Sequence, residues 1–319
     1  MAHAHLRPLF SVIIPCYNSE ATIASAIQSV LSQDDGDFEL IVVDDGSRDR
    51  SVLAAVTAIG GDARGRVMLC HNAGPAAARN HGASLARGRL LAFLDSDDRW
   101  ASGLLSAHRE KFSLSGDIAI SFGRTVFFDS KMETQGRCSA HHASLEIVDM
   151  LAENPLCTSS NIVVRRDVFE MVGGFDDAMR YAEDQEFVVR VLATTSSRVV
   201  GIDAPLVHYR TSAGGLSADL SRMERGWDAL MTRARQYCSP DVFAAAEAPA
   251  KALHARYLAR RALRTGQPGI RALRYLWTAL RADTRALLGR ETRRTLMTAA
   301  GVAASLLLPH RLIAPLIAA

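Results

Sequence analysis

Apolar runs alternate with amphipathic segments along the first part of this chain. Four mostly apolar runs have the length and composition of buried strands, and they span residues 10–15, 38–43, 67–70 and 90–94. Runs without polar alternation are typical of parallel strands that are buried on both faces. Segments with apolar residues at helical spacing follow the first three runs, at 19–32, 47–59 and 75–86. This order predicts an α/β fold, with a Rossmann-like, mostly parallel sheet and helices on both faces.

The pattern is less regular after Trp100. The elements expected there are two strands around Gly123, a strand at 158–164, a short helix that ends at Gly173, a helix at 181–192 and a strand at 205–209. From residue 216 onward the chain reads as helices, with interruptions at Pro240, Pro249, the turn 266–269 and Pro309. We therefore predict a disordered N-terminus at 1–9, an α/β domain at 10–215 and an all-helical C-terminal region at 216–319.

Charge is distributed unevenly along the chain. The net charge is only +3, but residues 222–319 contain 17 Lys and Arg against 6 Asp and Glu. Arginines alternate with leucines and aromatic residues at 250–288, which predicts amphipathic helices with a basic face. Such helices either lie on anionic lipid or pack on the protein as solvated faces. The apolar segment 296–308 is too short to span a bilayer, since a spanning helix needs about 20 apolar residues.

Cysteine usage and the N-terminus bear on the compartment. The five cysteines are scattered and show no C-x-x-C spacing, which predicts reduced thiols. The opening sequence MAHAHLRPLF lacks the apolar segment of a signal peptide. We expect a cytoplasmic protein, with peripheral attachment to the inner face of the cytoplasmic membrane as an alternative.

Acidic residues directly follow two of the predicted strands. Asp95, Asp97 and Asp98 come after the run 90–94, and the pair Asp44-Asp45 comes after the run 38–43. The carboxyl ends of parallel strands meet at one edge of a sheet, where open α/β sheets bind their ligands. Asp95 and Asp97 leave the same face of an extended chain, and two carboxylates held close together repel unless a cation lies between them. The pattern indicates a divalent cation with phosphate; the alternative is an acidic turn that caps the next helix.

Five motifs in this order resemble glycosyltransferase family 2, whose members are inverting enzymes with the A-type nucleotide-sugar-binding fold. The motifs are SVIIPCYN at 11–18, IVVDDGSRD at 41–49, NAGPAAARNHGASLARG at 72–88, LAFLDSDD at 91–98 and GGFDDAMRYAEDQEF at 173–187. The resemblance covers residues 10–210, about two thirds of the chain. It implies that residues 10–215 form a glycosyltransferase catalytic domain, and it favours the cation site over the acidic turn.

The resemblance implies donor-binding roles for eight residues: Pro15, Tyr17, Asn18, Asp44, Asp45, Arg79, Asp95 and Ser96. Tyr17 would cover the base of the nucleotide or, alternatively, fill the core. One aspartate of the DDGS motif would accept a hydrogen bond from the base, Asp45 in preference to Asp44. Arg79 would reach the diphosphate or hold the carboxylates near Asp95 in place; the alternative is a plain surface arginine.

The resemblance also assigns the cation and the general base. Asp97 would be the principal ligand of Mn²⁺ or Mg²⁺, together with Asp95 and, as a third ligand, His208; the alternative for His208 is a structural role. Asp184, in the Glu183-Asp184 pair, would be the general base that takes the proton of the acceptor hydroxyl. The alternative is that both acids only cap the first turn of a helix. A loop at 214–217 would cover the donor.

These implications predict a non-processive enzyme, because the chain lacks a Q-x-x-R-W sequence. It would move one sugar from a nucleotide-sugar, preferably a UDP-sugar, to a saccharide or lipid-linked saccharide in cell-surface polysaccharide or glycolipid assembly. The expected partners are that donor, that acceptor and an anionic membrane surface, but no nucleic acid. One alternative is a nucleotidyltransferase, although residues 15–18 do not form the Gly-rich basic loop that it requires. The other is a non-catalytic nucleotide-binding scaffold at the membrane.

Overall fold

The computed structural model describes residues 7–129, 134–211, 219–289 and 292–308, without the side chains of 134–137. Its contacts divide the chain into two compact units, the first comprising Met1–Leu145 and Pro155–Ser212, the second Glu146–Asn154 and Ala213–Ala319. The predicted domain boundary after residue 215, the loop at 214–217 and Pro309 lie outside the described residues. Leu9, predicted to belong to a disordered tail, is buried, and its N–H donates to Asp37.

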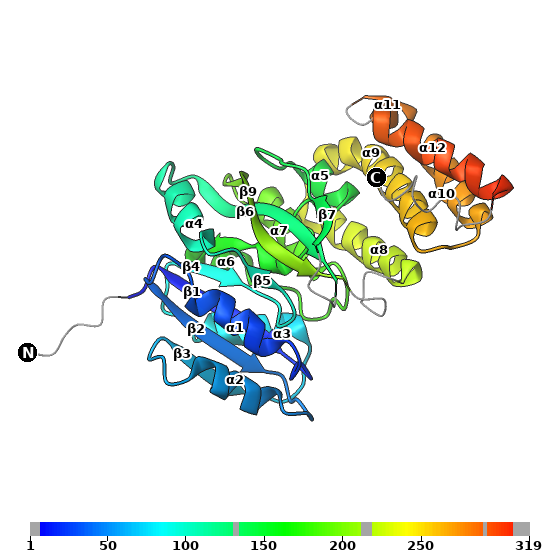
Figure 1. The fold of residues 1–319 in the computed structure, drawn as a ribbon. Coiled ribbons are helices and arrows are strands. Elements are labelled where there is room, and N and C mark those ends of the chain that lie inside the picture. The colour runs from blue at the N-terminus through cyan, green and yellow to red at the C-terminus, as the bar shows by residue number, and fades with distance from the viewer. Residues whose placement is uncertain (1–6, 130–133, 212–218, 290–291, 309–319) are drawn as a thin grey trace, which may run out of the picture. The chain divides into compact units, whose positions relative to one another are not determined.

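Four parallel strands form the first half of the sheet (Figure 1). They are β1 (Phe10–Cys16), β2 (Phe38–Asp44), β3 (Gly65–Leu69) and β4 (Leu90–Phe93), in the spatial order β3-β2-β1-β4. β1 pairs with both β2 and β4, and β2 pairs with β3, all in parallel. Each strand overlaps one of the apolar runs, because a strand covered on both faces is rich in apolar side chains.

Helices cover both faces of these strands. α1 (Ile23–Leu31) and α2 (Ser51–Ile59) share a core cluster with alternate residues of β1 and β2, among them Val12 and Ile14. The intervening residue Ile13 faces α3 (Pro75–Ser84) instead, where a Cβ on Gly82 would lie 2.5 Å from its side chain. Gly82 therefore lets α3 approach the sheet closely. The predicted α/β class, with helices on both faces, is confirmed.

The second half of the sheet is mixed rather than parallel. β6 (Ile118–Phe128) is one long strand with a register shift near Gly123, where two strands were expected. It pairs in parallel with β9 (Arg198–Arg210), which is longer than the predicted strand, and antiparallel with β8 (Val163–Arg165). β8 also pairs antiparallel with β4, β5 (Arg99–Trp100) with β9, and β7 (Thr134–Cys138) with β6. The short strands here have no βαβ repeat to reveal them.

Four α-helices and one 3₁₀ turn complete the part of the chain before residue 211: α4 (Leu104–Ser113), α5 (Ile147–Ala152), η1 (Ser159–Asn161), α6 (Arg166–Val172) and α7 (Glu183–Thr194). α6 ends at Gly173 in the left-handed conformation, as the sequence predicts. α5 belongs to the second compact unit, although nothing in the sequence pattern separates it from its neighbours.

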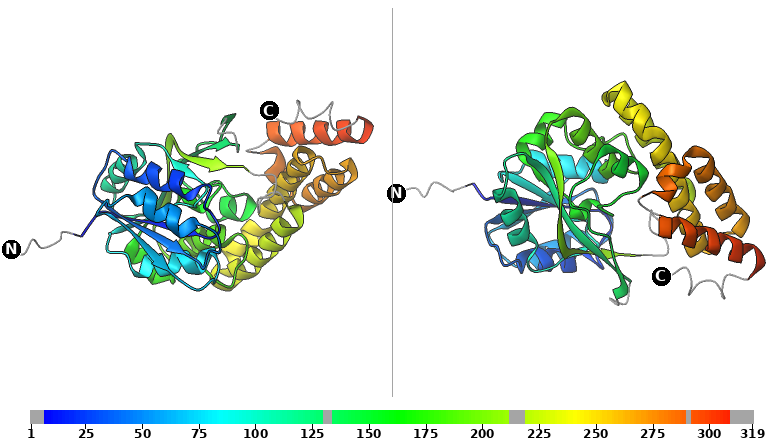
Figure 2. Two further views of the ribbon diagram at one scale, coloured as in Figure 1. Left: turned by 60° about the horizontal axis from the view of Figure 1, so that its bottom comes forward. Right: turned by 90° about the horizontal axis from the view of Figure 1, so that it is seen from above.

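The rest of the second unit is helical. Its helices are α8 (Leu220–Tyr237), α9 (Pro240–Arg264), α10 (Gly269–Ala282), α11 (Thr284–Leu288) and α12 (Thr292–Leu307), and α9, α10 and α12 pack side by side (Figure 2). The break expected at Pro249 is wrong: α9 continues through this proline, with Ala246 and Ala250 buried around it. Tertiary packing there outweighs the hydrogen bond that proline cannot make.

One arginine of the predicted basic face of residues 250–288 is buried instead of solvated. Arg256 is fully buried and forms an ion pair with Glu153, at 2.7 Å between Nη2 and Oε1. In the same unit, Trp227 stacks on His254 at 4.7 Å between ring centroids and donates its indole N–H to the Leu151 carbonyl. Residues 146–154 therefore join this unit through the Glu153–Arg256 ion pair and the hydrogen bond from Trp227 to Leu151.

All five cysteines are free. Among the described residues, none of the helices is long and apolar enough to cross a bilayer.

Candidate active site

The acidic residues that follow β4 form a closely packed cluster with short hydroxyl side chains. Asp95 Oδ1 lies 2.6 Å from Arg79 Nη2, and Ser159 donates to both oxygens of Asp95 at 3.0 Å. Thr158 donates to Asp95 Oδ2 at 3.2 Å. Burial works against ionisation, but the Arg79 charge and these hydrogen bonds lower the pKa of Asp95. Asp95 is therefore ionised at neutral pH, and both of its oxygens are already bound by protein donors.

Arg79 connects two motifs that are distant in the sequence. Its guanidinium is 4% exposed and also binds Glu183 at the start of α7, at 3.0 Å between Nη1 and Oε1. Burial alone would lower the pKa of Arg79, but the charges of Asp95 and Glu183 raise it. Of the two roles predicted for Arg79, its observed contacts match the second, in which it holds carboxylates in place. The Asp95 loop and the Glu183-Asp184 pair consequently meet at one place.

Asn80 fixes the approach to the Glu183-Asp184 pair. Its side-chain oxygen accepts from the Phe175 N–H at 2.9 Å, and its side-chain nitrogen donates to the Phe175 carbonyl at 2.8 Å. Gly174 has φ +72°, and a Cβ there would lie 2.6 Å from the Asn80 oxygen, so this position requires glycine. Phe175 packs against three other aromatic rings: Phe93, Phe169 and Phe187. This aromatic cluster attaches the 173–187 motif to β4.

Asp184 lies in the first turn of α7. Ala182 precedes the helix in the left-handed conformation with φ +60°, and Asp184 Oδ1 accepts from the Gln185 N–H at 2.8 Å. The side chain is half-buried. The helix dipole favours negative charge at this position. Asp184 therefore makes part of the capping contact that was predicted as the alternative, while its role as general base stays a prediction.

Asp97 and Asp98 add negative charge that the nearby Arg210 guanidinium offsets only in part. Asp98 is buried and accepts from Ser160 Oγ at 2.6 Å and from the Arg210 N–H at 2.9 Å. Burial, followed by the charges of Asp97 and Asp95, raises the pKa of Asp98 well above its usual value. Desolvation within the cluster, followed by the Asp95 charge, raises the pKa of Asp97 to about 6. Of the three acids after β4, Asp97 is nevertheless the exposed one. The cluster therefore holds more acids than cations.

This excess charge fits a divalent cation held by few protein ligands. The described residues contain no group of three His, Cys, Asp or Glu placed to bind a metal ion. Asp97 alone is exposed, and Mg²⁺ and Mn²⁺ accept one or two carboxylates with phosphate oxygens. His208 lies opposite Arg99 in the β5–β9 pair, and its pKa is lowered by burial and by the Arg99 charge. The ligand roles of Asp95, Asp97 and His208 stay predictions.

The loops after β1 and β2 hold each other at the same edge of the sheet. Asn18, with φ +49°, accepts from the Arg48 N–H at 2.8 Å, and its own N–H donates to Ser47 Oγ at 3.0 Å. Ser19 Oγ lies 2.7 Å from Ser96 Oγ and so connects these loops to the acidic cluster. The sequence places Ser96 among the donor-binding residues, and its neighbours agree with that position.

Pro15 and Tyr17 differ in their surroundings. Pro15 is buried inside β1, which continues to Cys16. The Tyr17 side chain is 47% exposed in the loop. The alternative in which Tyr17 fills the core is therefore wrong, and its ring is accessible to a ligand.

The two acids that end β2 are both buried but differ in their contacts. Asp45 accepts from the Ala73 N–H at 2.8 Å and from the Gly74 N–H at 2.9 Å, which positions the loop before α3. Asp44 Oδ2 accepts from the Ser47 N–H at 3.1 Å, whereas its Oδ1 has no hydrogen-bond partner among the described residues. An unpartnered buried oxygen is costly. A ligand hydrogen bond would satisfy Asp44, although the sequence ranks Asp45 first.

The hydroxyl groups of Thr158, Ser159 and Ser160 were missed by sequence reasoning. The run 158–164 was interpreted as a strand, but its first residues form η1, whose hydroxyls contact Asp95 and Asp98. The available signal was three consecutive short hydroxyl residues next to a buried Asn161. Such residues favour turns and contacts with carboxylates over strands.

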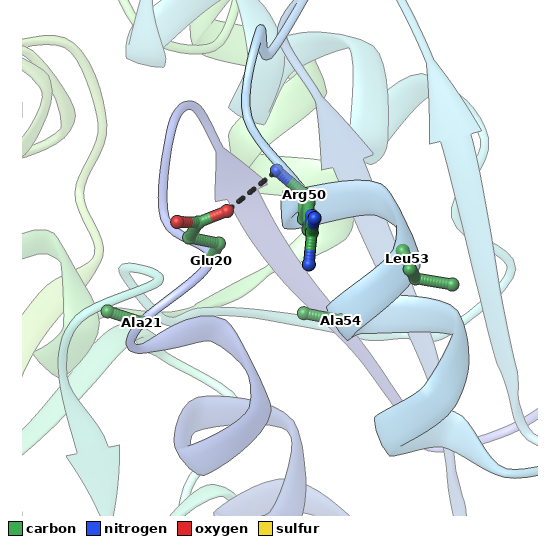
Figure 3. A pocket seen from close by; sticks show the side chains of 5 residues that line it. All are labelled: Glu20, Ala21, Arg50, Leu53 and Ala54. Atoms are coloured by element: carbon green, nitrogen blue, oxygen red, sulfur yellow. Dashed lines mark hydrogen bonds between the residues drawn. The ribbon is translucent and has the colours of Figure 1, made fainter.

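A separate surface hollow of about 410 Å³ lies between the loop after β1 and α2 (Figure 3). It is lined by Glu20, Ala21, Arg50, Leu53 and Ala54, and Glu20 accepts from the Arg50 N–H at 2.9 Å. None of the predicted site residues lines this hollow. The hydrogen bond between Glu20 and Arg50 holds the loop after β1 to the start of α2. We assign the hollow no catalytic role.

Comparison with known proteins agrees with this geometry. The sequence model described as "Glycosyl transferase family 2" matches residues 11–173. The uncharacterized glycosyltransferase EpsJ of Bacillus subtilis is 31% identical over 218 residues, which are 66% of this chain and 63% of EpsJ. The UDP-Glc:alpha-D-GlcNAc-diphosphoundecaprenol beta-1,3-glucosyltransferase WfgD of Escherichia coli is 28% identical over 70% of this chain and 85% of WfgD. This chain thus spans less than two thirds of the length of EpsJ.

Solved structures share the fold. S. aureus TarS 1–349 in complex with UDP-GlcNAc superimposes with a TM-score of 0.60 at 18% identity, covering 94% of this chain and 89% of TarS 1–349. The mannosyltransferase PcManGT of Pyrobaculum calidifontis, in complex with GDP-Man and Mn²⁺, gives a TM-score of 0.63 at 19% identity, covering 98% and 85%. These likenesses establish the A-type fold. Because the sequence model matches more than half of the residues, the chain belongs to glycosyltransferase family 2.

Proposed function

We propose that this protein is an inverting, non-processive glycosyltransferase that moves one sugar from a nucleotide-sugar, preferably a UDP-sugar, to an acceptor hydroxyl. The observation that carries the proposal is the double ion pair of Arg79 with Asp95 and Glu183. It joins the acidic loop, which suits a diphosphate and its cation, to the helix turn that carries a carboxylate suited to proton transfer.

Asp184 would act as the general base. It takes the proton of the acceptor hydroxyl while that oxygen attacks the anomeric carbon of the donor sugar. The new carbon–oxygen bond forms as the bond to the diphosphate breaks, and the nucleoside diphosphate leaves. One carboxylate suffices because this displacement has no covalent enzyme intermediate, unlike that of retaining glycosidases.

Asp97 would bind the cation directly, and Asp95 would add negative charge next to it. Bound Mn²⁺ or Mg²⁺ supplies positive charge to the diphosphate leaving group. Asp95 stays ionised because Arg79 and the Ser159 hydroxyl bind it. Its negative charge therefore adds to that of Asp97, although both Asp95 oxygens already accept hydrogen bonds from the protein. The PcManGT complex with Mn²⁺ supports this assignment by its fold. His208 would be the third ligand once the diphosphate is in place.

The nucleotide would lie over the loops that follow β1 and β2. The exposed Tyr17 ring offers a face for the base, and Asn18 is held by two hydrogen bonds beside it. Asp44 or Asp45 would accept the hydrogen bond of the base. The preference for UDP is supported by the UDP-GlcNAc complex of TarS, which has the same fold.

The acceptor would be a saccharide of a cell-surface polymer or glycolipid, presented on a lipid at the cytoplasmic side of the membrane. Support comes from what relatives are named for. TuaG of Bacillus subtilis is a putative teichuronic acid biosynthesis glycosyltransferase, and ExoO of Rhizobium meliloti is a succinoglycan biosynthesis protein. The acceptor named for WfgD is a diphosphoundecaprenol-linked sugar.

The deciding experiment measures release of nucleoside diphosphate from a nucleotide-sugar with Mn²⁺. The variant Asp184→Asn should lose about 10²- to 10⁴-fold in rate while it still binds the donor. The matched control is Asp177→Asn, an exposed acid of the same motif, which should keep the wild-type rate. Equal rates in Asp184→Asn and the wild type would reject Asp184 as the base, and no turnover in the wild type would favour the non-catalytic scaffold.

The donor can be identified by thermal shift with UDP-, GDP- and dTDP-sugars, each with and without Mn²⁺. A ligand that binds only the folded state raises the melting temperature. We expect the largest rise for a UDP-sugar with Mn²⁺. A rise with a nucleoside triphosphate and sugar phosphate, but with no nucleotide-sugar, would instead favour a nucleotidyltransferase.

A further inference from the structure

Large apolar side chains are exposed mainly in the last helices of the second unit. Among the described residues, nine of the sixteen exposed large apolar side chains lie between 270 and 308. The most exposed of these nine are Leu307 at 84%, Leu296 at 60% and Trp277 at 59%. Single exposed leucines are ordinary in folded proteins, but a concentration of them indicates an interaction surface.

The amphipathic pattern of α12 is the reverse of the usual one. Four apolar residues of α12 recur at helical spacing, and all four are exposed: Leu296, Ala300, Ala303 and Leu307. The buried side of the helix carries Thr295 and Thr298 with Val302. Thr295 donates to the Leu287 carbonyl at 2.8 Å, and Thr298 to the Arg294 carbonyl at 2.7 Å. A helix that places threonines inward and leucines outward is a candidate for binding a partner through its outer face.

The exposed apolar residues of α10 and α11 continue this surface. At one end, a Cβ on Gly269 would lie 2.7 Å from the Ser305 carbonyl oxygen, so the next residues, the exposed Ile270 and Leu306, lie near each other. At the other end, the Leu287–Thr295 hydrogen bond brings together the exposed residues that follow, Leu288 and Leu296. The exposed apolar residues of α10, α11 and α12 therefore approach one another at both ends of α12, and we call this set of exposed residues the α10–α12 face.

Positive charge surrounds the α10–α12 face. Residues 269–307 contain seven arginines and only two acids. Arg274, Arg281, Arg285 and Arg293 are exposed, and the Arg281 guanidinium lies 6.0 Å from the centroid of the Trp277 ring. A second copy of the chain would bring like charges together on this face. Anionic phospholipid head groups complement it, with the apolar side chains entering the boundary between head groups and acyl chains.

We propose that the α10–α12 face binds the surface of an anionic phospholipid bilayer. Trp277, Leu296 and Leu307 insert below the head groups, while the arginines contact lipid phosphates. The interaction needs no nucleotide, sugar or metal, so it can be tested apart from the transferase chemistry. If the proposed lipid-linked acceptor is also correct, this binding keeps the enzyme on the membrane that carries the acceptor.

The test is co-sedimentation of the full chain with phosphatidylcholine vesicles, with or without phosphatidylglycerol, in the absence of donor and metal. We expect binding to the anionic vesicles, weakened by salt, and at least tenfold weaker binding to the neutral ones. The double variant Leu296→Gln/Leu307→Gln should bind roughly 100-fold more weakly, at about tenfold per leucine. The double variant Arg281→Gln/Arg285→Gln should bind roughly 20-fold more weakly, because each arginine near a membrane contributes about fivefold.

The control variant is Leu114→Gln, which makes the same change at a 68% exposed leucine of the first unit and should bind like the wild type. Trp277 gives a second readout, since its fluorescence should shift to the blue with anionic vesicles and the shift should disappear in Trp277→Phe. Wild-type melting temperatures in all variants confirm folding.

Three results would overturn the proposal. The first is no binding, or equal binding to neutral and anionic vesicles. The second is an equal loss in the Leu114→Gln control. The third is a wild-type dimer in sedimentation velocity that Leu296→Gln/Leu307→Gln converts to monomers, because the apolar face would then bind a second copy.

Discussion

The two ends of β1 and β2 carry buried carboxylates in opposite electrostatic situations. At the amino end, Glu39 of β2 accepts from Ser11 Oγ at 2.6 Å and pairs with Arg66 at 2.7 Å and Arg87 at 3.1 Å. At the carboxyl edge, the buried Arg79 pairs with Asp95 and with Glu183. Glu39 therefore has two cationic partners, whereas Asp95 shares one arginine with Glu183.

This difference separates a structural network from a binding site. Burial opposes ionisation of Glu39, yet hydrogen bonds from Ser11 and Arg87, together with the Arg66 charge, lower the pKa of Glu39. Asp97 and Asp98 have raised pKa values, because burial and neighbouring acids both oppose their charge. A balanced network stabilises the native state by itself, whereas an unbalanced cluster is relieved only when a cation or a ligand binds.

The largest expected effect comes from Arg79→Gln. The substitution leaves Asp95 and Glu183 without their buried counter-charge, so unfolding free energy should fall by about 3–5 kcal/mol. Diphosphate release should also fall to background, because the acidic loop and the Glu183-Asp184 pair lose their connection. Urea denaturation and the release assay measure the two effects. Arg79→Lys keeps the charge but cannot reach two carboxylates, and full activity in that variant would contradict the bridging role.

Glu39→Gln should destabilise the protein by about 2 kcal/mol, because charged hydrogen bonds from Ser11 and Arg87 are lost. Donor binding should not change. The lowered pKa sets the pH dependence: the contribution of Glu39 is complete above its ordinary value of 4.5 and is lost as pH falls through the folded pKa. Denaturation at pH 7 and at pH 4 should show a difference from the wild type that shrinks in acid. A constant difference would indicate lost packing rather than lost charge.

Ser159→Ala should cost about 1 kcal/mol, since it removes one hydroxyl that donates to both oxygens of Asp95. The midpoint of urea unfolding measures this effect. The metal-dependent thermal shift with donor should also weaken, because Asp95 is less well held. Ser113→Ala, at an exposed serine of α4, serves as the control and should change neither quantity.

Asp97→Asn should give the smallest change in stability, and of opposite sign. The raised pKa means that the folded wild type loses stability as pH rises from about 4 to about 6, because Asp97 then becomes charged beside Asp95. The variant lacks this loss and should melt slightly higher at pH 7 without ligand. It should also lose the additional thermal shift that Mn²⁺ gives with the donor. A lower melting temperature at pH 7 would show that Asp97 is neutralised within the protein.

The first half of the fold was predictable because its signals are local. β1 to β4 and α1 to α3 are each encoded by a run or period within about ten residues, and parallel pairing brings the acids of separate strands to one edge. The later strands were predicted with wrong lengths, since β6 and β9 pair across a long stretch of sequence around a register shift. Pro249 was interpreted as a break because local propensity does not include the packing that holds α9 together.

The sequence by itself determined the strand–helix order, the family motifs and the identities of Asp95, Asp97 and Asp184, because periodicity and residue chemistry are properties of short segments. Only the tertiary structure decided that Arg79 binds Asp95 and Glu183 instead of facing solvent, that the η1 hydroxyls support the acids, and that α5 joins the C-terminal helices. It also decided which side of α12 is exposed. The physical reason is that a side chain selects its partner by distance in the folded chain, and many partners compatible with the sequence exist until packing removes all but one.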